Sequence, residues 1–360
     1  MNQEIEKKYD PVTKFFLFIV SPISQFIFIL ITSIAVTFMA YGPIKKYFSL
    51  EPAPRILPMT PQKVSEWGGE PTEVKVGLHI RNFPEFDFVK NEFSIDGIFW
   101  FEFDPALISL DTISKFSFEK AVLKRKSEAY TKIIKDKFFA RYDIRLDFSM
   151  DLDYRFFPFD DHRMYITLLN RFVPPSEMMF ESRKSYFSIS DEINISGWAI
   201  DDKAVRTGYT EEKLEEYAPE KTVLYSKAVF SIDFKRLGVR YILLIILPFF
   251  IMFFTGLFSF AFDPETDEAT IRNLAIGTIT ALLSYRFVLE AMTPKVGYFV
   301  LSDYIWIILL LFALIEFLVE LALMKFGELT HFFIILRGSL FLSFHIIFFM
   351  TWYYFLHQLW

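Results

Sequence analysis

Residues 153–164, Asp-Tyr-Arg-Phe-Phe-Pro-Phe-Asp-Asp-His-Arg-Met, decide how this chain is organised. The residues just before them, 141–153, alternate between apolar and polar or charged side chains, as in a strand with one buried face. Residues 234–236, Phe-Lys-Arg, end a later strand and lead into long apolar segments. A loop with two phenylalanines flanking a proline therefore belongs to a β-rich region that is joined to a membrane region.

The Phe-Pro-Phe-Asp loop has a simple physical reading. Proline fixes the backbone dihedral angle φ and makes the turn rigid. Phe157 and Phe159 are large apolar groups on a loop, which favours docking on another apolar surface. A bundle of membrane helices is such a surface, and Asp160 is then a candidate partner for Arg236 at its boundary. The alternative is an ordinary tight turn capped by an aspartate.

Composition indicates a membrane protein with a substantial water-exposed part. The chain has 360 residues, of which 53% are hydrophobic and 19% aromatic, including 46 Phe. A net charge of -6 gives no sign of a nucleic-acid surface. There is no cysteine, which excludes disulfides, thiolate catalysis and cysteine-bound metal. The histidines form no spaced cluster, so we expect no metal site and no cofactor.

Hydropathy predicts a multi-pass protein. A helix needs ~20 apolar residues to cross a bilayer. Apolar stretches close to this length predict membrane helices at about 15–42, 241–262, 268–292, 299–324 and 332–356. The first is either a signal peptide or a retained anchor, and the anchor is favoured because a signal core has only ~7–15 apolar residues. The predicted parts are a cytoplasmic tail at 1–14, a helix at 15–42, a Pro-rich linker at 43–72, a β-domain at 73–236 and a helical domain at 237–360.

The β-domain is predicted from alternating strands. One face of residues 141–153 carries Tyr142, Ile144, Leu146, Phe148, Met150 and Leu152. Two further strands present Phe93, Ile95, Phe99, Phe101 and Phe103, and Ala228, Phe230, Ile232 and Phe234. Several short alternating strands with Pro, Gly and Asp between them predict an antiparallel β-sandwich. The fold class is therefore membrane α+β: a β-sandwich, a four-helix bundle and one extra N-terminal membrane helix.

The chain resembles the pentameric ligand-gated ion channels, or Cys-loop receptors, of prokaryotic type, over about residues 73–356. The matching positions are Asp153, Phe157-Pro158-Phe159-Asp160, Arg236, Pro248, Pro294-Lys295 and Tyr298. The resemblance implies a homopentamer with a pore lined by the second helix of this domain. It also implies agonist binding between outer domains, and coupling to the pore through Phe157, Pro158, Phe159, Asp160, Arg236, Pro294 and Lys295. The N-terminal helix is an addition to this pattern.

Three positions depart from that resemblance. The family's bridging cysteines fall on Met150 and Met164, where we expect an apolar contact instead. His162 stands where the family usually has Gln. An aromatic position of the agonist site falls on Arg171, next to Phe172. The ligand-binding candidates are Arg171, Phe172, Tyr209, Tyr217 and Tyr225. The acidic loop at about 206–224 favours a cation, amine or proton as agonist, or else is only a solvated hairpin.

The candidate pore helix carries small and polar side chains at helical spacing. They are Asn273, Gly277, Thr280, Ser284 and Phe287. Small and hydroxyl residues also pack helix against helix, and a shift by one residue would instead present Arg272, Ile276, Ile279, Leu283 and Arg286. Asp263, Glu265, Asp267 and Glu268 make one end acidic, which favours cations, although Arg272 opposes this. Arg286 and Glu290 are spaced for an ion pair.

Ionisable residues also lie at membrane depth. Glu316, Glu320, Arg337 and His345 sit within apolar helices. The helical rise of ~1.5 Å per residue places Glu320 level with Arg337 on an antiparallel neighbour, and Glu316 near Ser343 and His345. Such groups are costly unless they are paired or functional. A buried structural pair and a protonation switch are both consistent with this pattern.

The sequence therefore predicts a ligand-gated ion channel rather than an enzyme. Its expected partners are four further copies of itself, a small-molecule, cation or proton agonist, and the lipid bilayer, with no nucleic acid. An alternative is a non-conducting membrane sensor or scaffold of the same fold, which signals through a partner protein at the N-terminal helix. A membrane enzyme is disfavoured because no nucleophile–base pair is evident. We expect the inner cell membrane, a periplasmic or extracellular β-domain and a cytoplasmic N-terminus.

Overall fold

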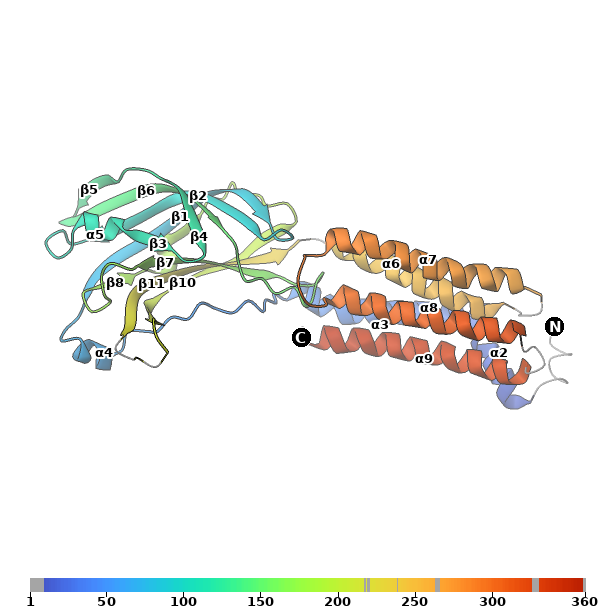
Figure 1. Cartoon of the computed structure of the whole chain (residues 1–360). Coiled ribbons are helices and arrows are strands. Elements are labelled where there is room, and N and C mark those ends of the chain that lie inside the picture. Colours follow the sequence, from blue (N-terminus) through green and yellow to red (C-terminus); the bar gives the residue numbers. More distant parts are fainter. Residues whose placement is uncertain are drawn as a thin grey trace. The chain divides into compact units, whose positions relative to one another are not determined.

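The computed structural model describes residues 10–216, 218, 221–237, 239–262, 266–325 and 330–358. The chain forms two compact units (Figure 1). One comprises Met1–Phe48, Tyr154–Asp160 and Gly238–Trp360, and the other comprises Ser49–Asp153 and Asp161–Leu237. The Phe-Pro-Phe-Asp loop thus belongs to the helical unit, although the strands on both sides of it belong to the other unit.

The second unit contains two β-sheets. The seven-stranded sheet has the order β4-β6-β2-β1-β8, with β5 on β6 and β9 on β1, and the four-stranded sheet has the order β10-β11-β7-β3. The strands of the first sheet are β1 (Thr72–Asp87), β2 (Glu92–Phe103), β4 (Ala121–Lys126), β5 (Tyr130–Ile134), β6 (Lys137–Phe148), β8 (Met178–Glu181) and β9 (Phe187–Ile189). Those of the second are β3 (Phe116–Phe118), β7 (His162–Asn170), β10 (Trp198–Lys213) and β11 (Thr222–Arg236). Short helices α5 (Leu110–Ser114) and η1 (Lys184–Tyr186) connect strands.

Most strand pairs are antiparallel, but the first sheet is mixed because β8 and β9 pair parallel with β1. The uniformly antiparallel prediction missed this edge. There, short β8 bonds to both sheets: it pairs with β1, and the Phe180 N–H donates to Ser226 Oγ of β11 at 2.9 Å. A hydrogen bond to a side-chain oxygen does not change the alternation of apolar and polar residues, so that alternation could not predict this edge.

One hydrophobic core takes side chains from both sheets. Every inward residue predicted for β2 and β11 is buried, and Phe99 of β2 meets Phe230 of β11 at a ring distance of 5.6 Å. The strand predicted at 141–153 was too long, since β6 ends at Phe148. Met150 and Leu152 follow it and are only partly buried against the core.

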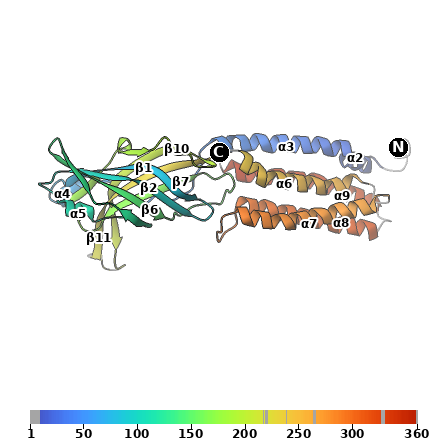
Figure 2. The same ribbon diagram turned by 90° about the horizontal axis from the view of Figure 1, so that it is seen from above.

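Among its described residues, the first unit has five helices that are long and apolar enough to cross a membrane, which indicates a membrane protein. They are α3 (Pro22–Lys45), α6 (Val239–Leu257) with the 3-10 turn η3 (Phe258–Ala261), α7 (Glu268–Met292), α8 (Leu301–Lys325) and α9 (Thr330–His357). Figures 1 and 2 show α6 to α9 running side by side, and Figure 2 shows α3 along one side of them.

The predicted helix at 15–42 is wrong in one respect, because the segment forms two helices. A short helix, α2 (Pro11–Ile19), precedes α3. The break falls where Ser21 caps α3, with its Oγ accepting from the Ser24 N–H, and Pro22 occupies the first turn. Helix α2 packs on α9 so closely that a Cβ on Gly338 would lie 2.4 Å from the Phe16 ring.

The linker predicted at 43–72 is shorter and more structured than expected. Helix α3 continues to Lys45, and β1 begins at Thr72. A short helix, α4 (Pro61–Glu66), interrupts the extended chain between them. Its capping residue Thr60 and the proline after it form an ordinary helix start.

Candidate functional site: the loop between β6 and β7

The loop Tyr154–Asp160 is a compact turn with buried aromatic side chains. The Phe157 N–H donates to the Tyr154 carbonyl at 2.9 Å, and the Phe159 N–H donates to the Phe156 carbonyl at 2.8 Å. The peptide bond between Phe157 and Pro158 is cis. Phe157 and Phe159 are only 1% and 7% exposed, so neither ring is left in water.

Within the helical unit, the loop docks on apolar groups as its sequence predicts. The Phe159 ring contacts Trp352 of α9 at a ring distance of 6.3 Å. The Phe156 ring contacts Phe48, which follows α3, at 5.4 Å. The Phe159 contact with α9 agrees with the expected docking, the docking of Phe157 stays a prediction, and the Phe156 contact is with the segment after the N-terminal helix.

The loop is also hydrogen-bonded to the link between α7 and α8. The Tyr154 N–H donates to the Tyr298 hydroxyl at 3.0 Å, and the Leu301 N–H donates to the Arg155 carbonyl at 2.9 Å. In the same link Pro294 is buried and Lys295 is exposed. Two hydrogen bonds therefore join the loop to the last part of the link and to the first residue of α8.

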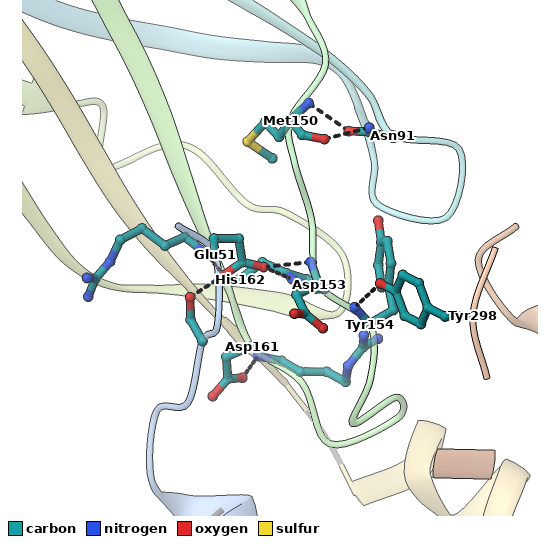
Figure 3. Close-up of polar contacts among 11 residues, drawn as sticks. Glu51, Asn91, Met150, Asp153, Tyr154, Asp161, His162 and Tyr298 are labelled. Atoms are coloured by element: carbon teal, nitrogen blue, oxygen red, sulfur yellow. Dashed lines mark hydrogen bonds and ion pairs between the residues drawn. The ribbon is translucent and has the colours of Figure 1, made fainter. Parts of the chain in front are cut away.

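Glu51 joins the two ends of this loop within the β-sheet unit (Figure 3). Its carboxylate accepts from the backbone N–H groups of Asp153 and Arg163, at 3.5 and 3.2 Å. It also bonds the Nδ1 atom of His162 at 2.6 Å, and the two side chains are 2% and 0% exposed. Sequence reasoning missed Glu51, because a lone glutamate in a Pro-rich linker belongs to no periodic pattern.

The surroundings of His162 are aromatic. The ring stacks on Phe88 at 4.6 Å and lies 5.5 Å from the Trp198 ring. The Arg236 guanidinium lies 4.4 Å from the centre of the Trp198 ring. The Arg236 backbone N–H donates to Asp161 at 2.8 Å. The predicted pairing of Asp160 with Arg236 stays a prediction, and the aspartate that holds the Arg236 backbone is the next one along.

The two methionines at the cysteine positions of the resemblance lie at the same core. Met164 is fully buried in it and Met150 is partly buried against it. Asn91 fixes Met150 by both backbone groups: its side chain accepts from the Met150 N–H at 2.9 Å and donates to the Met150 carbonyl at 2.7 Å (Figure 3). Their direct contact stays a prediction.

Helix α7 separates a buried face from an exposed one. The buried face carries Ile271, Ala275, Thr278, Leu282 and Leu289. The predicted pore-lining residues Asn273, Gly277, Thr280, Ser284 and Phe287 are all exposed. Among the residues that a shift by one position would present, Arg272, Ile276 and Leu283 are also exposed, whereas Ile279 and Arg286 are partly buried. The exposed face is thus free of the other described helices of its own chain. A single chain does not decide which of the two sets of residues would line a pore.

The charged ends of α7 are paired. Arg286 forms the predicted ion pair with Glu290 at 2.9 Å, and it also pairs with Asp303 of α8. At the other end Arg272 pairs with Glu268 at 3.5 Å. Asp267 precedes the helix as its cap residue, whereas Asp263 and Glu265 lie outside the described residues.

The ionisable residues at membrane depth form a buried network. Arg337 and Glu320 make the predicted ion pair at 3.1 Å, and both are buried. Arg337 also donates to the carbonyls of Ser259 and Phe262, which end η3. Glu316 accepts from Ser259 Oγ at 2.6 Å, and His345 bonds Thr32 of α3 at 3.0 Å. These two hydroxyl partners were not foreseen, because both come from helix segments far away in sequence.

The ligand-binding candidates are only partly brought together. The Arg171 guanidinium lies 5.9 Å from the Tyr225 ring centre, and burial, with Glu212 nearby, raises the pKa of Tyr225. Phe172 is 69% exposed. Tyr209 is buried, with the Trp67 ring 5.3 Å away, so it is covered by the linker. Tyr217 lies outside the described residues.

Within the described parts of the chain, no three His, Asp or Glu side chains gather as a metal site. No protein-family model and no curated protein matches this chain.

Proposed function

We propose that this chain is one subunit of a homopentameric ligand-gated ion channel with a pore lined by α7. One observation supports this most strongly: the loop Tyr154–Asp160 belongs with the membrane helices and is hydrogen-bonded to the α7–α8 link. A loop that connects two strands of a soluble domain and also grips the end of a membrane helix is suited to passing a conformational change to that helix.

The proposed agonist is a cation, an amine or a proton, bound by the β-sheet domain near the β10–β11 hairpin. The acidic residues Glu211 and Glu212 support binding there, whereas Arg171, whose guanidinium lies near the Tyr225 ring, opposes it. Cation conduction is supported by Asp267 and Glu268 at one end of α7, since a ring of carboxylates would concentrate cations at the mouth.

Purified protein in liposomes tests the proposal through thallium influx. Influx should be evoked by at least one member of a panel of protons, calcium, primary amines and quaternary amines. Tyr298→Phe removes the hydroxyl that accepts from the Tyr154 N–H and should weaken the evoked influx, whereas Tyr304→Phe, in nearby α8, should not. Influx that is absent under every condition, from protein shown to be folded, would count against a channel.

A non-conducting sensor is the second candidate, and α3 favours it. The helix is tied into its own unit by polar bonds: Gln25 donates to the Leu257 carbonyl and Thr32 bonds His345. Its other side leaves Phe26, Leu30 and Phe38 exposed, with Phe38 at 78%. A partner helix in the membrane would fit this side. Co-purification of a membrane protein that Phe38→Ala releases, together with absent ion influx, would favour the sensor over the channel.

A further inference from the structure

The segment between α3 and β1 is fastened to the β-sheet unit at both of the places on which the proposed function depends. One fastening is at the ends of the loop Tyr154–Asp160, and the other is on the β10–β11 hairpin. A simple spacer between an anchor helix and a domain needs no such contacts. We call residues 49–67 the strap.

The first fastening is a buried latch made by Glu51. Its carboxylate receives the N–H of the last residue before the loop and the N–H of a residue just after it, Asp153 and Arg163. The His162 ring fills the remaining side at 2.6 Å, so the charge lies out of water among hydrogen-bond donors. A carboxylate in this position keeps the two ends of the loop together, and its loss would leave buried polar groups without their acceptor.

The second fastening extends the β10 edge. Leu57 and Tyr209 exchange both backbone hydrogen bonds, at 2.7 and 2.9 Å. The neighbouring residue must be glycine, because a Cβ on Gly208 would lie 2.2 Å from the Leu57 carbonyl oxygen. Trp67 covers the Tyr209 ring, and Arg55 pairs with Glu211 of the same strand at 3.1 Å, although that exposed pair adds little.

The strap is stiff between its two fastenings. Pro52 and Pro54 restrict the backbone between Glu51 and Leu57 to extended conformations. Its first residue follows the end of α3 closely, since α3 ends at Lys45. Phe48, immediately before the strap, also packs on Phe156 of the loop. The polypeptide leaving the N-terminal helix therefore contacts the loop through Phe48 in the helical unit, and contacts the residues that flank the loop through Glu51 in the β-sheet unit.

We propose that the strap is a built-in regulatory tether. Within the β-sheet unit it holds the two ends of the Tyr154–Asp160 loop, at Asp153 and Arg163, and the edge of β10, and the N-terminal helix acts on both only through the continuous chain of the strap. The role of the strap in gating rests on the proposed function. The hydrogen bonds by which the strap holds the loop ends do not depend on whether the protein conducts ions. It assigns Glu51 as a positioning residue of the loop.

Hydrogen–deuterium exchange on the full chain in lipid nanodiscs tests the tether without an agonist. Glu51→Gln keeps the shape of the side chain but removes its charge. It should raise exchange at least about tenfold in residues 153–163, as expected when hydrogen bonds to a charged group are weakened. Because the strap is stiff, exchange in residues 206–213 should rise as well. Glu70→Gln, an exposed glutamate beyond the strap, should change neither segment.

A second variant tests the role of the helix and does not disturb the latch. A protease site inserted between Lys46 and Tyr47 allows α3 to be cut from the strap after assembly. Cutting should raise exchange in residues 153–163, whereas cutting a site inserted at the β5–β6 turn, residues 135–136, should not. Unchanged exchange after cutting, or a Glu51→Gln effect confined to His162, would overturn the tether.

Thallium influx separates this inference from the proposed function. If the protein conducts, cutting should shift the agonist concentration for half-maximal influx at least about fivefold, the lower end of ordinary coupling between sites. If it does not conduct, the channel proposal fails, while the exchange experiment still decides whether the strap holds the loop.

Discussion

At the scale of single residues, each unit has a buried carboxylate that bonds groups within that unit. Glu51 accepts two backbone N–H groups in the β-sheet unit, and Glu320 is paired with Arg337 among the helices. The second pairing is predictable from the sequence, because the helical rise fixes depth along an antiparallel neighbour. The first is not, because nothing local to Glu51 indicates that residues over 100 positions away will supply its partners.

Breaking the buried ion pair should be far more costly than breaking an exposed one. Arg337→Met leaves Glu320 buried without its counter-charge, and we expect a loss on the order of 3 kcal/mol in the free energy of unfolding. Arg272→Met breaks an exposed Arg–Glu pair of the same unit and should cost less than ~1 kcal/mol. Thermal unfolding in detergent measures both. Equal losses would show that burial of the pair is unimportant.

Tyr142 should make the β-sheet unit sensitive to alkaline pH. Burial raises the pKa of this core tyrosine, so the folded state keeps its proton to higher pH than the unfolded state does. The folded state then binds more protons, and stability falls as pH rises above the unfolded pKa of ~10. Tyr142→Phe should lose less stability than the parent between pH 8 and pH 11. Tyr130→Phe, which changes an exposed tyrosine, should behave like the parent.

At the scale of elements, helix α7 has one face against its own bundle and one face exposed. Its buried and exposed positions follow the helical period, which is why the sequence could predict the exposed stripe from its small and polar residues. The ends of helices and strands were harder to predict. The break at Ser21 and the end of β6 at Phe148 depend on a capping hydroxyl and on Asn91, neither of which alters hydropathy.

The exposed stripe of α7 can be mapped with single cysteines, since the parent chain has none. In the proposed pore, a charged thiol reagent should abolish most ion influx through Thr280→Cys and Ser284→Cys. Thr278→Cys is the matched control, because Thr278 is buried and should not react. Block at Ile276→Cys and Leu283→Cys instead would favour the shifted register, and block at no position would argue that α7 lines no pore.

At the scale of the whole molecule, the coarse plan was predictable: a β-rich domain, apolar helices after it and one helix before it. Composition and hydropathy carry that information. The loop Tyr154–Asp160 clusters with the helical unit, as expected for a loop whose large phenylalanines need an apolar surface to cover them. The fastening of the linker was not, because its contacts are made with backbone groups, which no side-chain pattern records.

Native mass spectrometry checks the assembly and the N-terminal helix together. We expect complexes of five copies, each with the full chain mass of 42.6 kDa. A pentamer of shorter chains lacking the first ~40 residues would mean that the N-terminal segment is cleaved like a signal peptide. Monomers or dimers in every mild detergent would contradict a pore formed by five copies of α7.

The bonds of α3 have a consequence for how the protein is made. Gln25 and Thr32 find their partners 232 and 313 residues later in the chain. At a synthesis rate of ~5–20 residues per second, the bond from Thr32 to His345 forms only after roughly 15–60 s. Helix α3 is thus the first of the five apolar helices to enter the bilayer, but its hydrogen bonds to the other helices are among the last to form. Until then Gln25 has its local acceptor, the Val20 carbonyl, whereas Thr32 waits for His345, which is almost the last part of the helical unit to be made.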